Sequence, residues 1–229
     1  MQGPVWHARQ MGLLLLIKMN NEYQEIDMER WERRELYEHF SHTRQPHYAI
    51  AANIDVTKLL AYKRENGLSF YLVLIFLATE SLNSIENFKL RMAEGRVVRY
   101  ATIHPNFTHK RANEQLFHFY TGRRQSSLRQ FVSDTSEAIA QQTTLFGGYA
   151  PSPNLVYFSC NPAVDATAIT NPGLDDPEDA IPRINWGRYV KRDGRWLLNI
   201  TITVNHRFID GYHIGLFFER LQALIDTLQ

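Results

Sequence analysis

The amino-acid sequence predicts an α/β fold, because apolar residues follow a helical period in some segments and alternate with polar residues in others. Residues 70–82 are apolar nearly all round, which is typical of a buried helix. Residues 195–205 alternate in the manner of a strand with one buried face. A chain of 229 residues with 44% hydrophobic and 21% charged residues is ordinary for one soluble globular domain.

Helices are predicted in the first third of the chain. Residues 27–42 are charged and helix-prone. Asp55 is a good N-cap residue for a helix that runs through Lys63. Ser69 can cap the buried helix over 70–82 in the same way.

Two hairpins are predicted at dipeptides that favour tight turns, Glu94-Gly95 and Asp193-Gly194, because glycine tolerates the left-handed backbone that such turns require. The flanking strands are expected over 88–92 and 97–101 for the first hairpin, and over 184–190 and 195–205 for the second. Between the hairpins we expect a strand over 116–120, a helix over 128–139, a strand over 155–159 and a loop over 171–182.

The end of the chain carries the clearest pattern. Four apolar residues share one face of the last strand: Leu198, Ile200, Ile202 and Val204. His206 falls in phase with them, so it is expected to face the core side. Asp210-Gly211 then forms a turn, and an amphipathic helix over 214–228 follows.

Composition excludes several classes of partner and site. A net charge of +1 provides no basic field for nucleic acid. The single cysteine, Cys160, excludes an internal disulfide and a thiolate metal cluster, and is compatible with a reducing compartment. The longest apolar run, 70–78, is far below the roughly 20 residues that a membrane span needs. We therefore expect a cytoplasmic protein without nucleic-acid or membrane partners.

Residues 1–18 look unlike the rest of the chain. Their apolar run, 13–17, is shorter than the roughly 7–15 residues of a signal peptide's apolar region. Met19 opens a polar stretch that reads like a natural beginning. We interpret 1–18 as an N-terminal extension or a misassigned start, and expect one domain over 19–229.

His206 is the strongest candidate for chemistry. A histidine held by fixed hydrogen bonds at the end of a buried strand face can serve as a general base. The structural alternative is a core histidine satisfied by backbone groups. Three roles stay open for Asp210: it could orient the imidazole, bind a distant arginine such as Arg33 or Arg34, or only cap the following helix.

Other kinds of site have little support. His39 and His42, or His206 and His213, could pair sterically, but no third metal ligand has a suitable spacing, so we expect no metal. Cys160 sits in a predicted strand, where such a residue is usually inert. Neither a Gly-x-Gly-x-x-Gly sequence nor a Walker loop is present, which leaves dinucleotide and nucleoside-triphosphate chemistry unsupported.

Several ordered motifs together resemble one enzyme family. They are Trp31-Glu32-Arg33-Arg34-Glu35, Leu90-Arg91-Met92, Phe107-Thr108, Ser159 with Pro162, Pro182, Tyr189, and the run from Asn205 to His213 that contains His206-x-x-x-Asp210-Gly211. Across residues 19–229 this series resembles the trimeric chloramphenicol acetyltransferases of the CoA-dependent acyltransferase superfamily. The resemblance implies a two-layer α/β sandwich with a large mixed β-sheet, a homotrimer, and a channel at each subunit interface where the two substrates meet.

The resemblance also implies roles for individual residues. His206 would remove a proton from the acceptor hydroxyl, which attacks acetyl-CoA directly, and Ser159 would donate a hydrogen bond to the oxyanion. Asp210 would pair with Arg33 to support the site, and Tyr189 would stack on the CoA adenine. Acetyl-CoA is thus the implied co-substrate, with no metal. Chloramphenicol or a similar small hydroxyl compound is the implied acceptor, with antibiotic resistance as the implied role.

The acceptor pocket matches the family less well than the catalytic residues do. The match assigns four residues to this pocket: Phe40, Tyr48, Tyr157 and Asn185. The family usually has a tyrosine near Phe40, an asparagine near Tyr157 and a threonine in place of Asn185. Pro46, Lys110 and Ala163 also differ from the residues that the family usually has at these positions. Acetyl transfer is therefore better supported than chloramphenicol as the acceptor.

Two other functions remain as alternatives. A dihydrolipoamide acyltransferase catalytic domain shares the His-Arg-x-x-Asp-Gly sequence, but this chain has no lipoyl-type domain or flexible Ala/Pro linker and does carry the motif around Trp31. A non-enzymatic relative that kept only the fold is the third reading, and the presence of both His206 and Ser159 argues against it.

Overall fold

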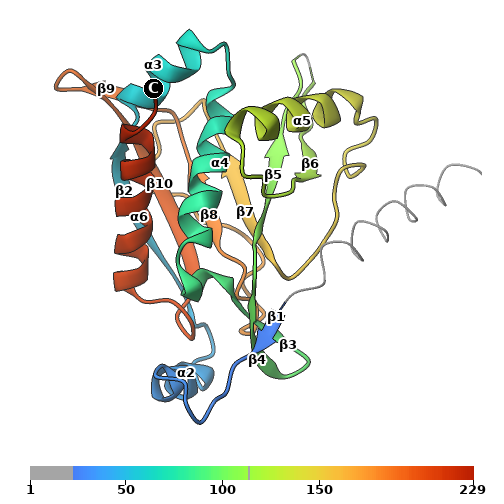
Figure 1. The fold of residues 1–229 in the computed structure, drawn as a ribbon, viewed down its shortest axis with the longest axis vertical. Helices are drawn as coiled ribbons and strands as arrows, with labels where there is room; N and C mark the ends of the chain where they lie inside the picture. Colours follow the sequence, from blue (N-terminus) through green and yellow to red (C-terminus); the bar gives the residue numbers. More distant parts are fainter. Residues whose placement is uncertain (1–22, 113) are drawn as a thin grey trace, which may run out of the picture.

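The computed structural model describes residues 23–112 and 114–229, and its centre is a seven-stranded mixed β-sheet (Figure 1). The strand order is β2-β10-β8-β7-β5-β6, and β9 also pairs with β10. The bounds are β2 (His47–Asp55), β5 (His104–His109), β6 (His118–Thr121), β7 (Leu155–Cys160), β8 (Arg183–Trp186), β9 (Val190–Arg192) and β10 (Arg195–Asn205). Strand β7 pairs in parallel with β5 and β8, and the other pairs are antiparallel.

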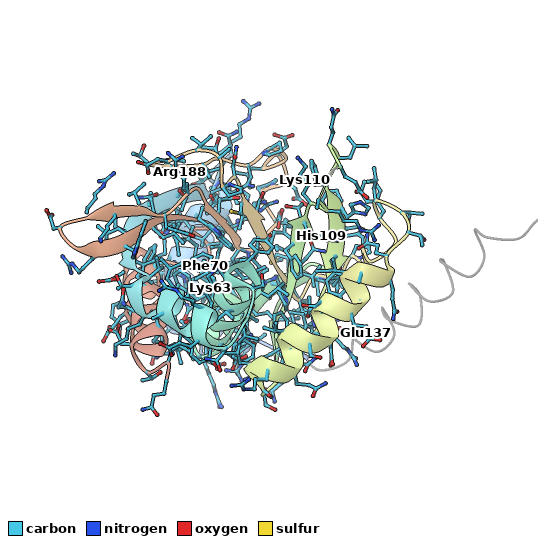
Figure 2. The ribbon with its side chains drawn as sticks, turned by 90° about the horizontal axis from the view of Figure 1, so that it is seen from above. Lys63, Phe70, His109, Lys110, Glu137 and Arg188 are labelled. Atoms are coloured by element: carbon cyan, nitrogen blue, oxygen red, sulfur yellow. The ribbon has the colours of Figure 1, made fainter. Side chains whose placement is uncertain are left out.

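Four helices form a second layer on one face of this sheet (Figure 1; Figure 2 gives the view from above). They are α3 (Thr57–Glu65), α4 (Phe70–Asn83), α5 (Leu128–Gln141) and α6 (Gly211–Asp226). Ser69 caps α4 by accepting a hydrogen bond from the Leu72 amide at 3.4 Å. The predicted two-layer α/β sandwich is confirmed, and its core lies between the helices and β10, where Ile200 and Ile202 are fully buried.

A small sheet and a separate helix lie at one end of the molecule (Figure 1). The sheet has the order β1-β4-β3, with β1 (Tyr23–Glu25), β3 (Leu90–Ala93) after a 3₁₀ turn (Glu86–Lys89), and β4 (Arg96–Tyr100). Glu94 and Gly95 have φ angles of 52° and 74°, so the predicted hairpin turn is confirmed. Helix α2 (Arg34–Ser41) is near this end, away from the helical layer.

Several predicted elements need correction. The helix expected over 27–42 is only eight residues long, and Asp55 bonds the Thr57 amide at 2.9 Å while Val56 is the N-cap of α3. The strand expected over 184–190 is broken into β8 and β9. A Cβ atom on Gly187 would lie 2.4 Å from the Val164 carbonyl oxygen, so a neighbouring segment passes too close there for a side chain.

Three strands were not predicted from the sequence, namely β1, β2 and β5. The edge strand β2 pairs with β10 from Leu197 to Asn205, and β5 lies between β6 and β7. The expected strand over 116–120 begins later, at His118. Residues 1–18, interpreted above as an extension, lie outside the described residues. Within the described part of the chain, no helix has the length and apolar character to cross a membrane.

Candidate active site

The predicted motif lies where β10 gives way to α6. His206 follows the last residue of β10, and its amide donates to the Pro46 carbonyl at 2.8 Å. Its side chain contacts Tyr48, which pairs with Val204 on the apolar face of β10, but it is 33% exposed because β10 ends at Asn205. Asp210 is the N-cap residue of α6, with its own amide donating to Nδ1 of His213 at 3.0 Å.

Two aromatic rings hold the imidazole of His206. The Phe40 ring, from α2, stacks on it at 4.0 Å between ring centroids with an interplanar angle of 14°. The Tyr48 ring, from β2, lies at 4.5 Å and 36°. Two rings at such short distances cannot both lie on one face of an imidazole, so Phe40 and Tyr48 flank it on opposite faces. The imidazole is left with only its edges for polar contacts.

The edge that carries Nδ1 points toward Asp210. This nitrogen is buried and lies 3.3 Å from Oδ1 of the carboxylate, and it has no hydrogen-bond partner among the described residues. A carboxylate beside Nδ1 favours the tautomer with the proton on that nitrogen, which leaves the lone pair on Nε2. Tyr48 donates its hydroxyl to the Ile209 carbonyl at 3.2 Å, and burial, followed by the charge of Asp210, raises the pKa of Tyr48 to about 12.

Arg33 connects the motif to the start of α2. Its guanidinium contacts both carboxylate oxygens of Asp210, with Nη2 donating to Oδ1 at 2.6 Å and Nη1 donating to Oδ2. It also donates to the carbonyls of His206 at 2.8 Å and Arg207 at 2.9 Å. Hydrogen bonding to Arg33 lowers the pKa of the Asp210 carboxyl. Arg34, the other arginine considered above, pairs instead with Glu38 at 2.7 Å on the surface of α2.

Ser159 lies on β7 in a row of residues that crosses the sheet. It pairs with Asn185 on β8, and Asn185 pairs with Thr201 on β10. The side chain of Ser159 is half-buried, whereas Asn185 is 1% exposed. The Asn185 amide exchanges hydrogen bonds of 2.5 and 3.2 Å with Asn171, which fixes the loop that follows β7.

Tyr189 lies in the break between β8 and β9. Its ring contacts Phe70, at the start of α4, with a centroid distance of 5.2 Å, and Trp196 on β10 at 5.5 Å. The neighbouring residue Arg188 is exposed; Figure 2 labels it together with Phe70. Tyr189 is therefore partly covered by aromatic neighbours on a surface that also carries a cation.

Within one chain the two candidate catalytic residues are far apart. Thr201, in the row of Ser159, precedes His206 by five residues along β10, a length of roughly 16 Å at about 3.3 Å per residue. Ser159 is displaced by two further strands. The pair therefore lies well beyond hydrogen-bond reach. In Figure 1, β9 and α2 lie near opposite ends of the sheet.

An aromatic cluster near Tyr157 was not singled out in the sequence. Tyr157, two residues before Ser159 on β7, interacts with the side chain of Tyr149, and burial raises the pKa of Tyr157. Tyr149 contacts the rings of Phe119 at 5.8 Å and Phe146 at 6.4 Å. Phe146 is 61% exposed, an unusual position for such a ring. No periodic pattern marks residues 142–150, so their sequence gave little signal.

Comparison with known proteins assigns the chain to a family. The family model described as "Chloramphenicol acetyltransferase" matches residues 19–222. The chain belongs to the chloramphenicol acetyltransferase family. Among curated relatives, the chloramphenicol acetyltransferase of Escherichia coli is 25% identical over 213 residues, which cover 90% of this chain and 95% of that protein. The enzyme of Clostridium perfringens is 26% identical over 209 residues, with 89% and 95% covered.

Solved structures support the same assignment. A chloramphenicol acetyltransferase structure has a TM-score of 0.83 with 26% identity, and covers 91% of this chain and 100% of its own. The cubic core of a pyruvate dehydrogenase multienzyme complex has a TM-score of 0.63 at 19% identity, over 92% and 94% of the two chains, which shows a shared fold only. This family member is therefore an acyltransferase enzyme of the chloramphenicol acetyltransferase type. Over 23–112 and 114–229, no group of three or more His, Cys, Asp or Glu side chains is arranged to hold a metal ion.

Proposed function

We propose that this enzyme transfers the acetyl group of acetyl-CoA to a hydroxyl of chloramphenicol or a similar small acceptor, with His206 as the general base. The observation that carries this proposal is the fixed imidazole. It is stacked between Phe40 and Tyr48 and has Nδ1 directed at a carboxylate that Arg33 holds in place. A base so oriented presents the Nε2 lone pair in one direction, as proton abstraction requires.

The reaction needs few groups because a thioester is already activated. Nε2 of His206 takes the proton of the acceptor hydroxyl while the oxygen attacks the acetyl carbonyl carbon. The tetrahedral intermediate carries a negative oxygen, to which the Ser159 hydroxyl donates a hydrogen bond. Collapse breaks the carbon–sulfur bond, and the departing CoA thiolate takes the proton from His206. Acetylated acceptor and free CoA are the products, and the enzyme returns to its starting state.

Tyr189 is the proposed contact for the CoA adenine. Its ring is half-exposed and supported by Phe70, so one side can stack on a planar base. Phe40 and Tyr48, expected to line the acceptor pocket, would then border it next to the base. Tyr157 remains a proposed pocket residue beside the aromatic cluster. For Asn185 the pairing with Asn171 favours a supporting role behind the pocket.

We propose a homotrimer in which each site takes His206 from one subunit and Ser159 from its neighbour. The separation of roughly 16 Å or more along the sheet within one chain supports this arrangement, because one subunit alone cannot align both groups on one acetyl carbonyl. The enzyme would act in the cytoplasm, where acetyl-CoA is available.

The proposed activity is tested by following free CoA with a thiol reagent. Purified enzyme receives acetyl-CoA with chloramphenicol, or with dihydrolipoamide in a parallel reaction in which the acetylated product is separated by chromatography. We expect turnover with chloramphenicol that disappears in His206→Gln while the melting temperature is retained. Turnover with dihydrolipoamide alone would favour the other acyltransferase reading, and no turnover with either acceptor would contradict the proposed acceptor class.

Mixed trimers test the shared site. His206→Gln and Ser159→Ala subunits are unfolded and refolded together, or co-expressed with different tags. Random assembly leaves about a quarter of the sites with an intact His206 and an intact Ser159 if the two come from different subunits. Activity of that order in the mixture, with little in either parent, is expected. Activity no higher than that of the parents would show that one subunit supplies both residues.

A further inference from the structure

Helix α2 is attached to the His206 motif at both of its ends. At its start, the Arg33 side chain reaches the carboxylate of Asp210 and the carbonyls of residues 206 and 207. At its other end the direction is reversed, since Nη2 of Arg207 donates to the carbonyl of Ser41, the last residue of α2, at 3.2 Å. The ring that stacks on the imidazole, Phe40, immediately precedes Ser41.

Arg207 occupies an environment that is costly for a cation. The residue is only 6% exposed, and its Nε has no hydrogen-bond partner among the residues that the structure describes. Within the same residues its guanidinium forms no ion pair with a carboxylate, in contrast to Arg33. A buried charge with so few hydrogen bonds lowers the stability of the fold. A contribution to stability therefore does not explain why an arginine stands at position 207.

The C-terminal end of α2 offers the Arg207 guanidinium a favourable contact. The last carbonyls of a helix have no partner within the helix and carry partial negative charge, so an arginine beside them is favourable. The backbone amide of Arg207 is itself held by Oδ1 of Asn205 at 3.0 Å, so the residue sits on a rigid base at the end of β10. A contact from that base to Ser41 sets how far the Phe40 ring lies from the imidazole.

We propose that Arg207 is a positioning residue for His206, acting through the C-terminal end of α2 to keep Phe40 stacked on the imidazole. Arg33 then fixes the Asp210 carboxylate beside the Nδ1 edge of the imidazole, while Arg207 fixes the Phe40 ring on one face of it. Without Arg207, α2 keeps the Arg33 contacts at its start and the Tyr37–Phe208 ring contact in its middle, but loses the hydrogen bond at Ser41. The turn that carries Phe40 can then move away. The kinetic part of this inference rests on the proposed function, with His206 as the base, whereas the geometric part does not.

The geometric part is measured by the NMR signal of the His206 ring. Histidine labelled with ¹³C at Cε1 gives one proton–carbon signal per residue, and the His206 signal is the one lost in His206→Gln. A proton above an aromatic face is shifted upfield, so the Phe40 ring should shift this signal upfield. We expect Arg207→Met to move it downfield, toward its position in Phe40→Leu. Arg34→Met, a matched change on the exposed side of the same helix, should leave it unmoved.

Kinetics provide an independent readout. Arg207→Met should lower kcat on the order of tenfold, because small displacements of a catalytic group have large effects on rate. The KM values for acetyl-CoA and the acceptor should stay within about twofold, since no contact to either substrate is lost. In the double variant Arg207→Met/Phe40→Leu, kcat should fall no further than in the more affected single variant, because both act on one stack. Arg207→Lys, which keeps a cation, should restore part of the rate.

Distinct results would overturn the inference. An unmoved His206 signal in Arg207→Met, or losses in kcat that multiply in the double variant, would give Arg207 a purely structural role. If Arg207→Met does not fold, Arg207→Lys is measured instead and must shift the signal in the same direction by a smaller amount; no shift overturns the proposal. If the wild-type enzyme acetylates no acceptor, the proposed function fails while the NMR comparison still decides the role of Arg207.

Discussion

Replacement of Asp210 by asparagine tests the central ion pair of the site. The change keeps the size of the side chain and removes its charge, so Arg33 faces a neutral amide. Arg33 is only 8% exposed, and its contacts to the carbonyls of residues 206 and 207 keep it in place. The guanidinium cannot swing into water without breaking these bonds, and its charge stays buried without a counterion.

The size of the effect follows from the burial of the two partners. Breaking a fully buried ion pair costs about 3–5 kcal/mol, and an exposed one contributes about 0–1 kcal/mol. Asp210 is 29% exposed and its partner is buried, so we expect a loss of about 2–3 kcal/mol in the free energy of unfolding. For a chain of this length that loss corresponds to a fall of roughly 4–12 °C in melting temperature.

The pH dependence has a definite sign. Arg33 lowers the pKa of the Asp210 carboxyl in the folded protein. The stabilisation is therefore fully present above the ordinary carboxyl pKa of about 4 and is lost as the pH falls through the lowered folded value. The difference in stability between wild type and Asp210→Asn should be largest near neutral pH and shrink in acid.

Chemical denaturation at several pH values measures this difference, and the acetylation rate is followed in parallel. The rate should also fall, because the carboxylate no longer orients the Nδ1 edge of His206. Glu38→Gln is the matched control, because it removes a carboxylate from the exposed ion pair with Arg34 on α2. It should leave the melting temperature unchanged. If Asp210→Asn lowered the rate but kept wild-type stability at neutral pH, the structural role of the Arg33 pair would be refuted.

Three further substitutions test separate parts of the enzyme. Ser159→Ala should lower kcat by about a hundredfold or more through loss of the oxyanion hydrogen bond, which steady-state kinetics will detect; an unchanged kcat excludes that role. Tyr189→Ala should raise the KM for acetyl-CoA about tenfold and leave kcat within about twofold, whereas an unchanged KM would place the adenine elsewhere. Arg91→Met should destabilise the fold by about 3 kcal/mol or more in denaturant unfolding, because the buried guanidinium donates to carbonyls of the 3₁₀ turn, of β3, of Pro153 and of β7. Wild-type stability would contradict this.

Local patterns in the sequence were enough for much of the fold. The buried helix over 70–82, the turns at Glu94-Gly95 and Asp193-Gly194, and the long last strand all depend on periodicity or on backbone conformations that few residues adopt. Strands β2 and β5 were missed because alanines weaken the alternation in the first, while the second begins with histidine, proline and asparagine. Their strand conformation comes from pairing with distant neighbours, and a short window of sequence does not contain that information.

The sequence by itself determined the family, the identity of His206 and Ser159 as candidates, and the candidate partners of Asp210. Tertiary structure decided that Arg33 and not Arg34 pairs with Asp210, that Phe40 and Tyr48 flank the imidazole, and that Ser159 lies far from His206 within one chain. The physical reason is that motifs specify side-chain chemistry through neighbours in the chain. The ion pair and the ring stacking depend on how segments more than 150 residues apart pack against one another, as the 177-residue separation of Arg33 and Asp210 illustrates. The distance between Ser159 and His206 depends on the order of the strands in the sheet.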